Sequence, residues 1–141
     1  MQKPTMGKGC LGCLGAGVLA VVVFYFLLLE PERLFGSHTR FMAHWDHKIN
    51  LPGSAQILNR ESGGSFIDGH ITTVVLVPNK DVPAILAQVK PSPRQGGKVA
   101  QEGTALEGSV YGKQDGSDEL GITVKPDAPG VSRLTITTMH D

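Results

Sequence analysis

The chain has 141 residues, and its 13 Lys and Arg residues balance its 13 Asp and Glu residues. Only Lys3 and Lys8 precede Leu29, which leaves 11 basic and 13 acidic residues beyond that point. This slightly acidic region excludes the clustered basic surface of a nucleic-acid-binding protein, and its roughly 110 residues suffice for one hydrophobic core. Both cysteines, Cys10 and Cys13, lie in the N-terminal part, so no disulfide is expected beyond it.

The run from Cys10 to Leu29 contains no charged residue and no proline. As a helix it has about the length of a bilayer's hydrocarbon core, roughly 30 Å, and we predict a transmembrane helix over 10–29 after a tail over 1–9. A cleaved signal peptide is the first alternative, but the run passes directly into Glu30–Phe35 without a small-residue cleavage site. A helix buried in a soluble core is the second alternative.

The orientation of this helix follows from the basic residues beside it. Lys3 and Lys8 precede the run, whereas Glu30, Glu32 and Arg33 follow it. Since Lys and Arg stay on the cytoplasmic side and acids count for little, we expect a cytoplasmic N-terminus. The predicted location is the cell inner membrane, as a single-pass signal-anchor protein with a periplasmic or extracellular C-terminal domain.

Small residues follow a four-residue spacing in the first half of the predicted span. Gly12, Ala16 and Ala20 form one row, and Gly9, Cys13 and Gly17 form another. Such rows allow close helix approach in membranes, so we predict a helix-packing surface at Gly12, Ala16 and Ala20 for a protein partner or a homodimer. The alternative is the ordinary glycine and alanine content of membrane spans.

Residues 30–50 are predicted to be a juxtamembrane linker. Pro31 prevents a smooth continuation of the membrane helix. Ser37 can cap a new helix that has Phe41, Met42, Trp45 and Ile49 on one side. This aromatic side suits either the bilayer surface or packing on the outer domain, and the pattern does not decide between them.

Residues 51–141 are predicted to form an extracytoplasmic α+β domain. The element order is β-β-α-β-β-β, which indicates a mostly antiparallel sheet of about five strands with one packed helix. The expected strands are 54–61, 70–77, 106–111, 120–124 and 131–139, and the helix starts at Asn79 or Asp81 and ends before Pro91. The expected core comprises neighbours of Ile71 or Thr72, with Val74, Leu76, Ile85, Leu86, Ile122, Val124, Leu134 and Ile136.

Loops and turns separate these elements. Residues 92–104 are polar and contain glycines, and we expect a loop there. Turns are expected at 62–65, 114–117 and 127–130, because these segments are rich in Gly, Asp, Ser and Pro.

Two segments carry a resemblance to known proteins. Leu51-Pro52-Gly53-Ser54-Ala55 opens the first strand, and Asp81-Val82-Pro83-Ala84-Ile85-Leu86 starts the helix after the second. In this the chain resembles small domains of uncharacterised bacterial single-pass envelope proteins, over about a third of its length. The resemblance implies a bacterial setting and an α+β outer domain, and it implies no activity or functional residue.

A histidine cluster lies in the linker. His38, His44 and His47 are close in sequence, with Asp46 beside them, and a helix would place His44 and His47 on one face. These two are the metal-site candidates, although a zinc site needs further ligands and the sequence does not assemble them. The alternative is a solvated linker. Cys10-x-x-Cys13 lacks the strand-to-helix setting of a redox motif and is interpreted as packing residues.

No catalytic set emerges from the remaining residues. The serines lack the strand-turn-helix setting of a nucleophile, and the Gly-Gly pairs at 63–64 and 96–97 do not open a helix as a phosphate-binding loop would. We therefore predict no catalytic residue and no cofactor. The predicted function is a non-enzymatic, membrane-anchored interaction or accessory protein of the cell envelope, and the alternative is a periplasmic metal or small-ligand sensing domain.

Overall fold

The computed structural model describes residues 9–64, 69–92, 96–113 and 118–140. The chain divides into two compact units, Met1–Gly36 and Ser37–Asp141. The first contains α1 (Gly9–Leu29) and α2 (Pro31–Phe35). The second is an α+β domain that contains α3 (Arg40–His47), β1 (Gln56–Gly64), β2 (Gly69–Pro78), the 3-10 turn η1 (Asn79–Asp81), α4 (Val82–Leu86), β3 (Lys90–Pro91), β4 (Val99–Glu102), β5 (Ala105–Lys113), β6 (Glu119–Ala128) and β7 (Val131–Met139).

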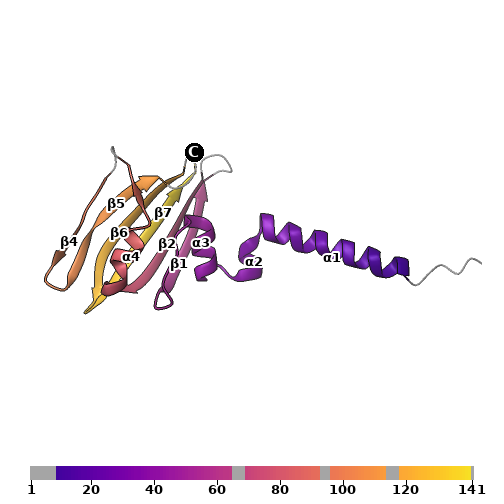
Figure 1. The fold of residues 1–141 in the computed structure, drawn as a ribbon, viewed down its shortest axis with the longest axis horizontal. Coiled ribbons are helices and arrows are strands. Elements are labelled where there is room, and N and C mark those ends of the chain that lie inside the picture. The colour runs from indigo at the N-terminus through magenta and orange to yellow at the C-terminus, as the bar shows by residue number, and fades with distance from the viewer. Residues whose placement is uncertain (1–8, 65–68, 93–95, 114–117, 141) are drawn as a thin grey trace, which may run out of the picture. The chain divides into compact units, whose positions relative to one another are not determined.

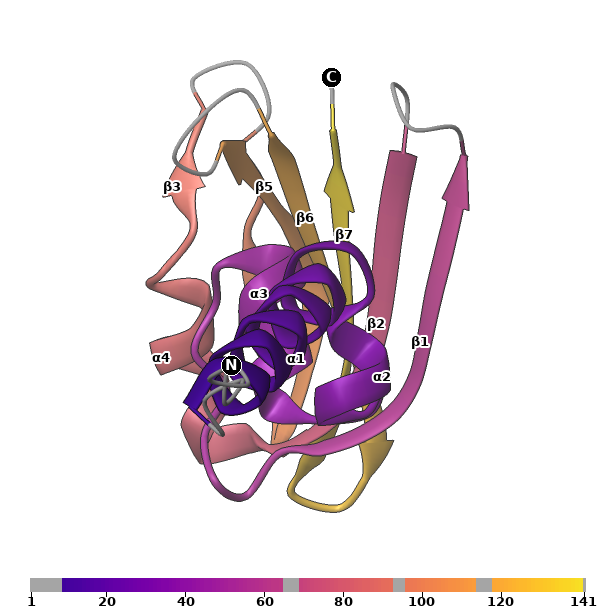
Figure 2. The same cartoon turned by 90° about the vertical axis from the view of Figure 1, so that its right-hand side faces the viewer.

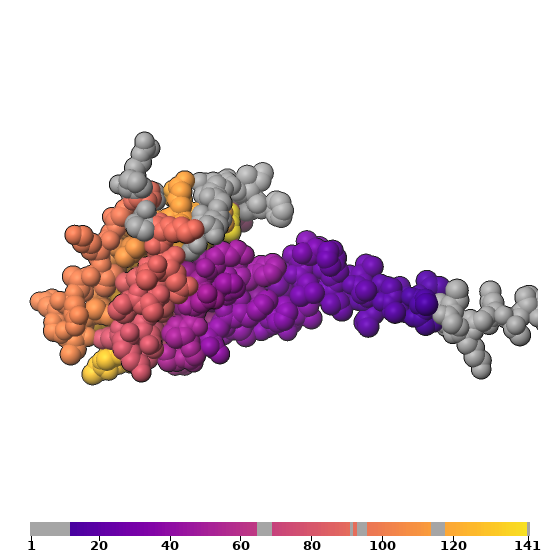
Figure 3. Space-filling model, in the orientation of Figure 1, coloured from indigo at the N-terminus to yellow at the C-terminus, as the bar shows by residue number. Residues whose placement is uncertain are grey.

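Helix α1 is apolar on all sides. Its Gly12–Leu29 stretch is long and apolar enough to cross a membrane, and none of its side chains is buried. On the face that Figure 3 shows, the α1 side chains are exposed along the helix. The core helix of a soluble domain would instead be buried, so this exposure argues against that alternative. The predicted tail lies outside the described residues, apart from Gly9, where α1 begins.

The predicted break after the apolar helix is confirmed. Helix α1 ends at Leu29, and Pro31 occupies the first turn of α2, where its missing N–H is not needed. The side chains of Arg33 and Glu30 form an ion pair of 2.6 Å across this turn. Gly36 ends α2 with a φ of 78°, a positive value that glycine adopts without steric cost.

The sheet is antiparallel throughout the described residues. Its strand order is β1-β2-β7-β6-β5-β3 (Figure 2), and β4 pairs with β5 as a seventh strand. The prediction of a mostly antiparallel sheet is confirmed, but β4 lies in the segment expected to be a loop, and β3 lies just before it. Both are short and polar, without the alternation that reveals a strand with one buried face.

Helices α3 and α4 both pack on the sheet, where one helix was expected. They lie on the same side of it in Figure 1, and both contribute to a single apolar core. We call this side of the sheet the inner face. The fully or almost fully buried core residues are Ala43, Ile49, Leu51, Val75, Val77, Val82, Ile85, Val89, Leu120, Ile122, Val124, Leu134 and Ile136.

The prediction of which β2 residues face the core is wrong. Val74 and Leu76 were expected in the core, but Thr73, Val75 and Val77 are buried there, and Val74 and Leu76 are only partly buried. Strand pairing determines which residues face the core, because Thr73 lies opposite Ile136 and Val75 opposite Leu134, and opposed residues of antiparallel strands share a face.

The other core predictions are mostly confirmed. Ile85, Ile122, Val124, Leu134 and Ile136 are 0 or 1 % exposed. Leu86 is partly buried and packs against this core, and Ile71 and Thr72 are partly buried.

The segment expected as a linker is largely part of the domain, since the second compact unit begins at Ser37. The cap of α3 is Thr39 rather than Ser37, because the Thr39 hydroxyl accepts a hydrogen bond of 3.3 Å from the backbone N–H of Met42. After α3, the backbone N–H of Asn50 donates to the Gln88 side chain, which in turn donates to the Asn50 carbonyl. These two bonds join the segment to the end of α4.

The expected turns have mixed outcomes. The turn at 114–117 lies outside the described residues. Strand β1 continues through Gly64, so residues 62–64 pair with β2 instead of turning. Between β6 and β7 the turn narrows to Pro129 and Gly130, and Gly130 has a φ of 76°, which a side chain would disfavour.

Candidate functional site

The face of the sheet opposite α3 and α4, which we call the outer face, is rich in hydroxyl groups. Strand pairing places Thr72, Thr137, Gly121 and Tyr111 in one row across β2, β7, β6 and β5. The adjacent row contains Val74, Thr135, Thr123 and Ser109. Because strand residues alternate between faces, these rows follow from the same alternation that buries the inner-face apolar residues.

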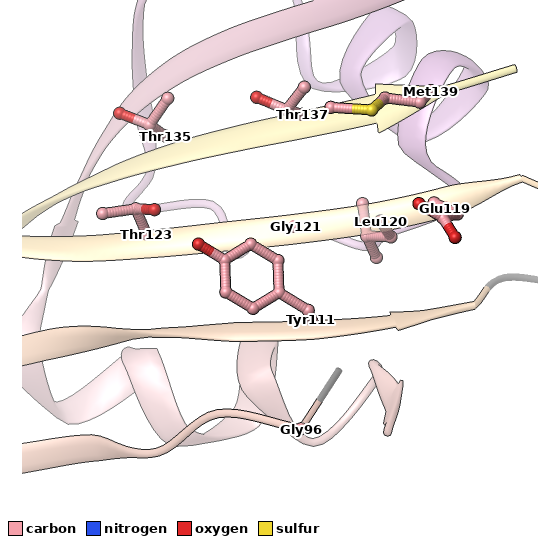
Figure 4. Close-up of a pocket in the computed structure, with 9 residues that line it drawn as sticks. All are labelled: Gly96, Tyr111, Glu119, Leu120, Gly121, Thr123, Thr135, Thr137 and Met139. Carbon is pink, nitrogen blue, oxygen red and sulfur yellow. The ribbon is translucent and has the colours of Figure 1, made fainter. Parts of the chain in front are cut away.

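An open hollow of about 550 Å³ lies on the outer face (Figure 4). Its lining comes from β5, β6, β7 and the segment before β4, and consists of Gly96, Tyr111, Glu119, Leu120, Gly121, Thr123, Thr135, Thr137 and Met139. Two large side chains in the hollow are about half exposed: Tyr111 is 45 % exposed and Met139 is 52 % exposed. The hollow is open, and the described part of its lining is mainly uncharged.

The position of the Tyr111 ring depends on Gly121. These residues lie directly opposite each other on β5 and β6, and Figure 4 shows the ring beside β6 at Gly121. A Cβ atom at Gly121 would lie 3.1 Å from two carbons of the ring, closer than an ordinary contact. The glycine thus lets the Tyr111 ring lie close to the sheet, where it forms one side of the hollow.

Hydroxyl groups on the outer face bond to one another across strands. The hydroxyls of Thr72 and Thr137 are 3.1 Å apart, and those of Ser109 and Thr123 are 3.0 Å apart. Each pair satisfies part of the hydrogen-bonding capacity of its members within the sheet. A partner that covers this face would therefore desolvate fewer unpaired polar groups, which lowers the cost of binding.

A second polar cluster lies on the inner face beneath α3. His47 is 1 % exposed, and its Nδ1 and Nε2 atoms each lie 2.7 Å from a threonine hydroxyl, Thr138 on β7 and Thr73 on β2. Beside it, the Asp46 carboxylate receives two hydrogen bonds from the Arg60 guanidinium, of 2.6 and 3.1 Å. The two side chains are only 2 and 10 % exposed. We call these five residues the His47 cluster.

Burial keeps the His47 ring neutral. Desolvation is the main reason that the pKa of His47 is lowered from 6.5 to about 4. The Asp46 carboxylate raises this pKa, whereas Arg60 and His140 lower it further. A neutral imidazole has one N–H donor and one acceptor, which matches a hydroxyl at each end of the ring. This arrangement fixes α3 to two neighbouring strands.

The metal-site candidates occupy different environments. His44 is exposed on α3, whereas His47 is buried with both ring nitrogens engaged by hydroxyls. His38 lies 2.7 Å from the Ser37 hydroxyl, and His140 pairs with Asp118 at 3.0 Å. Within the described ranges, no group of three or more His, Cys, Asp or Glu residues could hold a metal ion.

The predicted helix-packing residues of α1 are exposed. All three of Gly12, Ala16 and Ala20 have high exposed fractions, and the space around a Cβ at Gly12 is open. A shallow groove lies over the neighbouring row instead, lined by Cys13, Leu14, Gly17, Val18, Val21 and Val22. Cys13 is an exposed free thiol.

The residues that line the outer-face hollow were not predicted from the sequence. A signal for them was available, because the threonines at 135 and 137 alternate with buried Leu134 and Ile136. The contribution of Tyr111 to the hollow could not be predicted from such an alternation, since it depends on the strand register that places Tyr111 opposite Gly121.

Comparison of the chain with protein-family models, with curated proteins and with solved structures finds no match.

Proposed function

We propose that this chain is a membrane-anchored interaction protein of the cell envelope, non-enzymatic, whose domain binds a protein partner on the outer face of its sheet. The observation that carries the proposal is the outer-face hollow, with half-exposed Tyr111 and Met139 side chains beside threonine hydroxyls. Exposed apolar groups of this size cost free energy in water unless a partner covers them.

The chemistry of the hollow favours a polypeptide partner. Tyrosine and methionine are enriched at protein interfaces, because each offers a large apolar contact area and tyrosine adds a hydroxyl. Glu119 is the one charged residue among the described residues that line the hollow, so this part of the lining offers a strongly charged ligand little complementarity. We expect an uncharged segment of the partner, with an apolar side chain against Tyr111.

The proposed location is the inner membrane, with the N-terminus in the cytoplasm and the domain in the periplasm or outside the cell. The apolar α1 supports the membrane anchor. Lys3 and Lys8 before it support the orientation, because basic residues remain cytoplasmic. The resemblance to bacterial envelope proteins supports the setting.

Site-directed photocrosslinking in native membranes tests the outer face. A photoreactive residue replaces Thr137 in the hollow or, as the control, exposed Ala87 after α4 on the opposite side of the sheet. We expect a discrete crosslinked product from position 137 and none from position 87. Adding Tyr111→Ala should weaken the product by about tenfold, the effect of losing a well-packed aromatic contact. Equal products from both positions, or none from either, would refute the proposal.

The span offers a second contact for the same partner or for another copy of the chain. Gly12, Ala16 and Ala20 form an exposed row on α1 that would admit a second helix closely. Ala16→Ile fills this row and should weaken association of the span by about 1 kcal/mol in an energy-transfer assay in membranes. Val22→Ile is the control, and equal effects of the two changes would remove the role of the small residues.

A further inference from the structure

Helix α3 has two faces of different chemistry. Met42, Ala43, Asp46 and His47 are buried toward the sheet. The opposite face, which we call the outward face of α3, is exposed at Arg40, Phe41, His44, Trp45 and Lys48. Arg40, His44 and Lys48 are four residues apart, as are Phe41 and Trp45. The five positions therefore form one continuous strip along the helix. The sequence left open whether this segment packs on the domain or lies at the bilayer surface. One face of α3 packs on the domain, so the exposed face is available for a different contact.

The outward face combines aromatic rings with positive charge. The rings of Phe41 and Trp45 stack with centroids 6.3 Å apart, and the Lys48 ammonium lies 5.3 Å from the Trp45 ring centroid. Phe41 and Trp45 are 45 and 43 % exposed. The strip contains no acid, because Asp46, the one acidic residue of α3, is buried against Arg60.

The backbone at Lys48 adds a separate observation. Among the described residues that are not glycine, Lys48 alone has a positive φ, of 53°, and it ends α3 in the left-handed conformation. Glycine or asparagine would take this position with less steric cost. An unfavourable residue at such a position suggests a use for its side chain, and here the side chain places a cation beside Trp45.

The chain length places a limit on where this strip can be. Phe41 follows the end of the apolar helix at Leu29 by so few residues that the connecting chain spans at most about 40 Å. Helix α2 lies within that connection and shortens its reach. A domain anchored by α1 is therefore tethered within about 40 Å of the bilayer surface, and α3 can reach the headgroup region, where Trp and Lys side chains are favoured.

We infer that the outward face of α3 lies on the headgroup region of the membrane and binds anionic phospholipids, with Trp45 and Phe41 at the acyl boundary and Arg40 and Lys48 at the phosphates. Aromatic residues beside Lys and Arg are the composition of helices that lie in the bilayer interface. Basic residues near the surface add attraction to anionic lipid. This inference rests on the proposed membrane anchor, but it does not depend on the outer-face partner.

Trp45 is the only tryptophan of the chain, so its fluorescence reports directly on this face. The full chain is reconstituted into bilayers of phosphatidylcholine and phosphatidylglycerol, with acyl chains brominated near the glycerol backbone or unmodified. We expect the brominated lipid to lower Trp45 emission by about twofold, since interfacial tryptophan lies at that depth. Resistance of the chain to carbonate extraction is measured on the same samples to establish insertion.

A charge-reversal pair supplies the matched control. The double change Arg40→Glu and Lys48→Glu should restore most of the emission, while Lys113→Glu with Lys125→Glu, which alters exposed lysines on the strands, should leave the quenching unchanged. Bilayers of phosphatidylcholine alone should quench less than mixed bilayers, which separates lipid charge from burial of the rings.

The outcomes are distinct. A chain that resists extraction while Trp45 remains unquenched overturns this inference and leaves the anchor standing. A chain that carbonate releases overturns the anchor and this inference together. Trp45 emission that is unquenched in lipid bilayers but shifted to shorter wavelength in native membranes assigns this face to a protein partner and overturns the lipid assignment.

Discussion

The two faces of the sheet are made by the same strands but differ in how their polar groups are satisfied. Beneath α3 on the inner face, buried polar side chains are held by partners from another element, as His47 of α3 is by Thr73 and Thr138. On the outer face, the hydroxyls of Thr72 and Thr137 and those of Ser109 and Thr123 pair across adjacent strands and remain partly accessible. Enclosed polar groups are costly to disturb, whereas accessible ones can exchange their partners with water or a ligand.

The largest test of this contrast compares two ion pairs. Asp46→Ala removes the buried carboxylate that accepts two hydrogen bonds from Arg60, and we expect a loss of about 4 kcal/mol in the free energy of unfolding. Asp127→Ala removes the partner of Arg133, whose side chain is 51 % exposed, and should cost less than about 1 kcal/mol. Urea unfolding in detergent micelles measures both. Similar losses for the two variants would mean that the inner face is not the more sensitive one.

A pH titration of stability should show the next largest effect. The folded pKa of His47 is about 4, below its unfolded value of 6.5, so the unfolded state binds the additional proton between these values. The contribution of the neutral ring is fully present above pH 6.5 and is lost as the pH falls toward 4. The loss amounts to about 3 kcal/mol.

The matched variant isolates this contribution. In His47→Gln the titrating ring is gone, so the difference in stability between pH 6.5 and pH 4 should be smaller than in the natural chain by about that amount. Denaturant midpoints at a series of pH values provide the comparison. If both proteins show the same dependence on pH, the ring does not remain neutral in the fold.

The smallest expected effect on stability concerns the outer face. Gly121→Val displaces the Tyr111 ring from the sheet, because even a Cβ there would lie 3.1 Å from two ring carbons. We expect the free energy of unfolding to change by no more than about 1 kcal/mol, since the ring is already half exposed and valine favours strands. Crosslinking from position 137 should nevertheless fall strongly.

A double-mutant cycle sharpens that test. In a Tyr111→Ala background, Gly121→Val should cause little further loss of crosslinking, because the ring that it displaces is absent. Additive losses would show that Gly121 acts on the partner independently of Tyr111.

The contrast between faces also explains which parts of the fold could be predicted. Strands β6 and β7 alternate cleanly, with Ile122 and Val124 beside Thr123, and Leu134 and Ile136 beside Thr135, so their buried residues were predicted correctly. Strand β2 carries β-branched or aliphatic residues on both faces, so its sequence pattern does not show which of them face the core. Distant contacts determine this, namely the pairing of Val75 with Leu134 and the bond between Thr73 and His47.

The candidate sites were less predictable for a related reason. The sequence near a long apolar helix does not show whether a histidine is solvated, binds a metal or is buried. For His47, the position of Thr73 and Thr138 on the sheet distinguishes these cases. The hollow likewise requires the register that sets Tyr111 opposite Gly121. Local patterns thus located most strands, while side-chain partners distant in sequence decided the sites.

The docking of α3 determines where the domain can be cut. A fragment that starts at Leu51 lacks Asp46 and His47, so Arg60 loses its carboxylate and Thr73 and Thr138 lose the ring between them, while the apolar residues under α3 meet water. A fragment that starts at Ser37 retains Thr39 as the helix cap and keeps all of these contacts. Limited proteolysis should accordingly release a resistant product after cleavage near Gly36, and the product should not be trimmed further to residue 50.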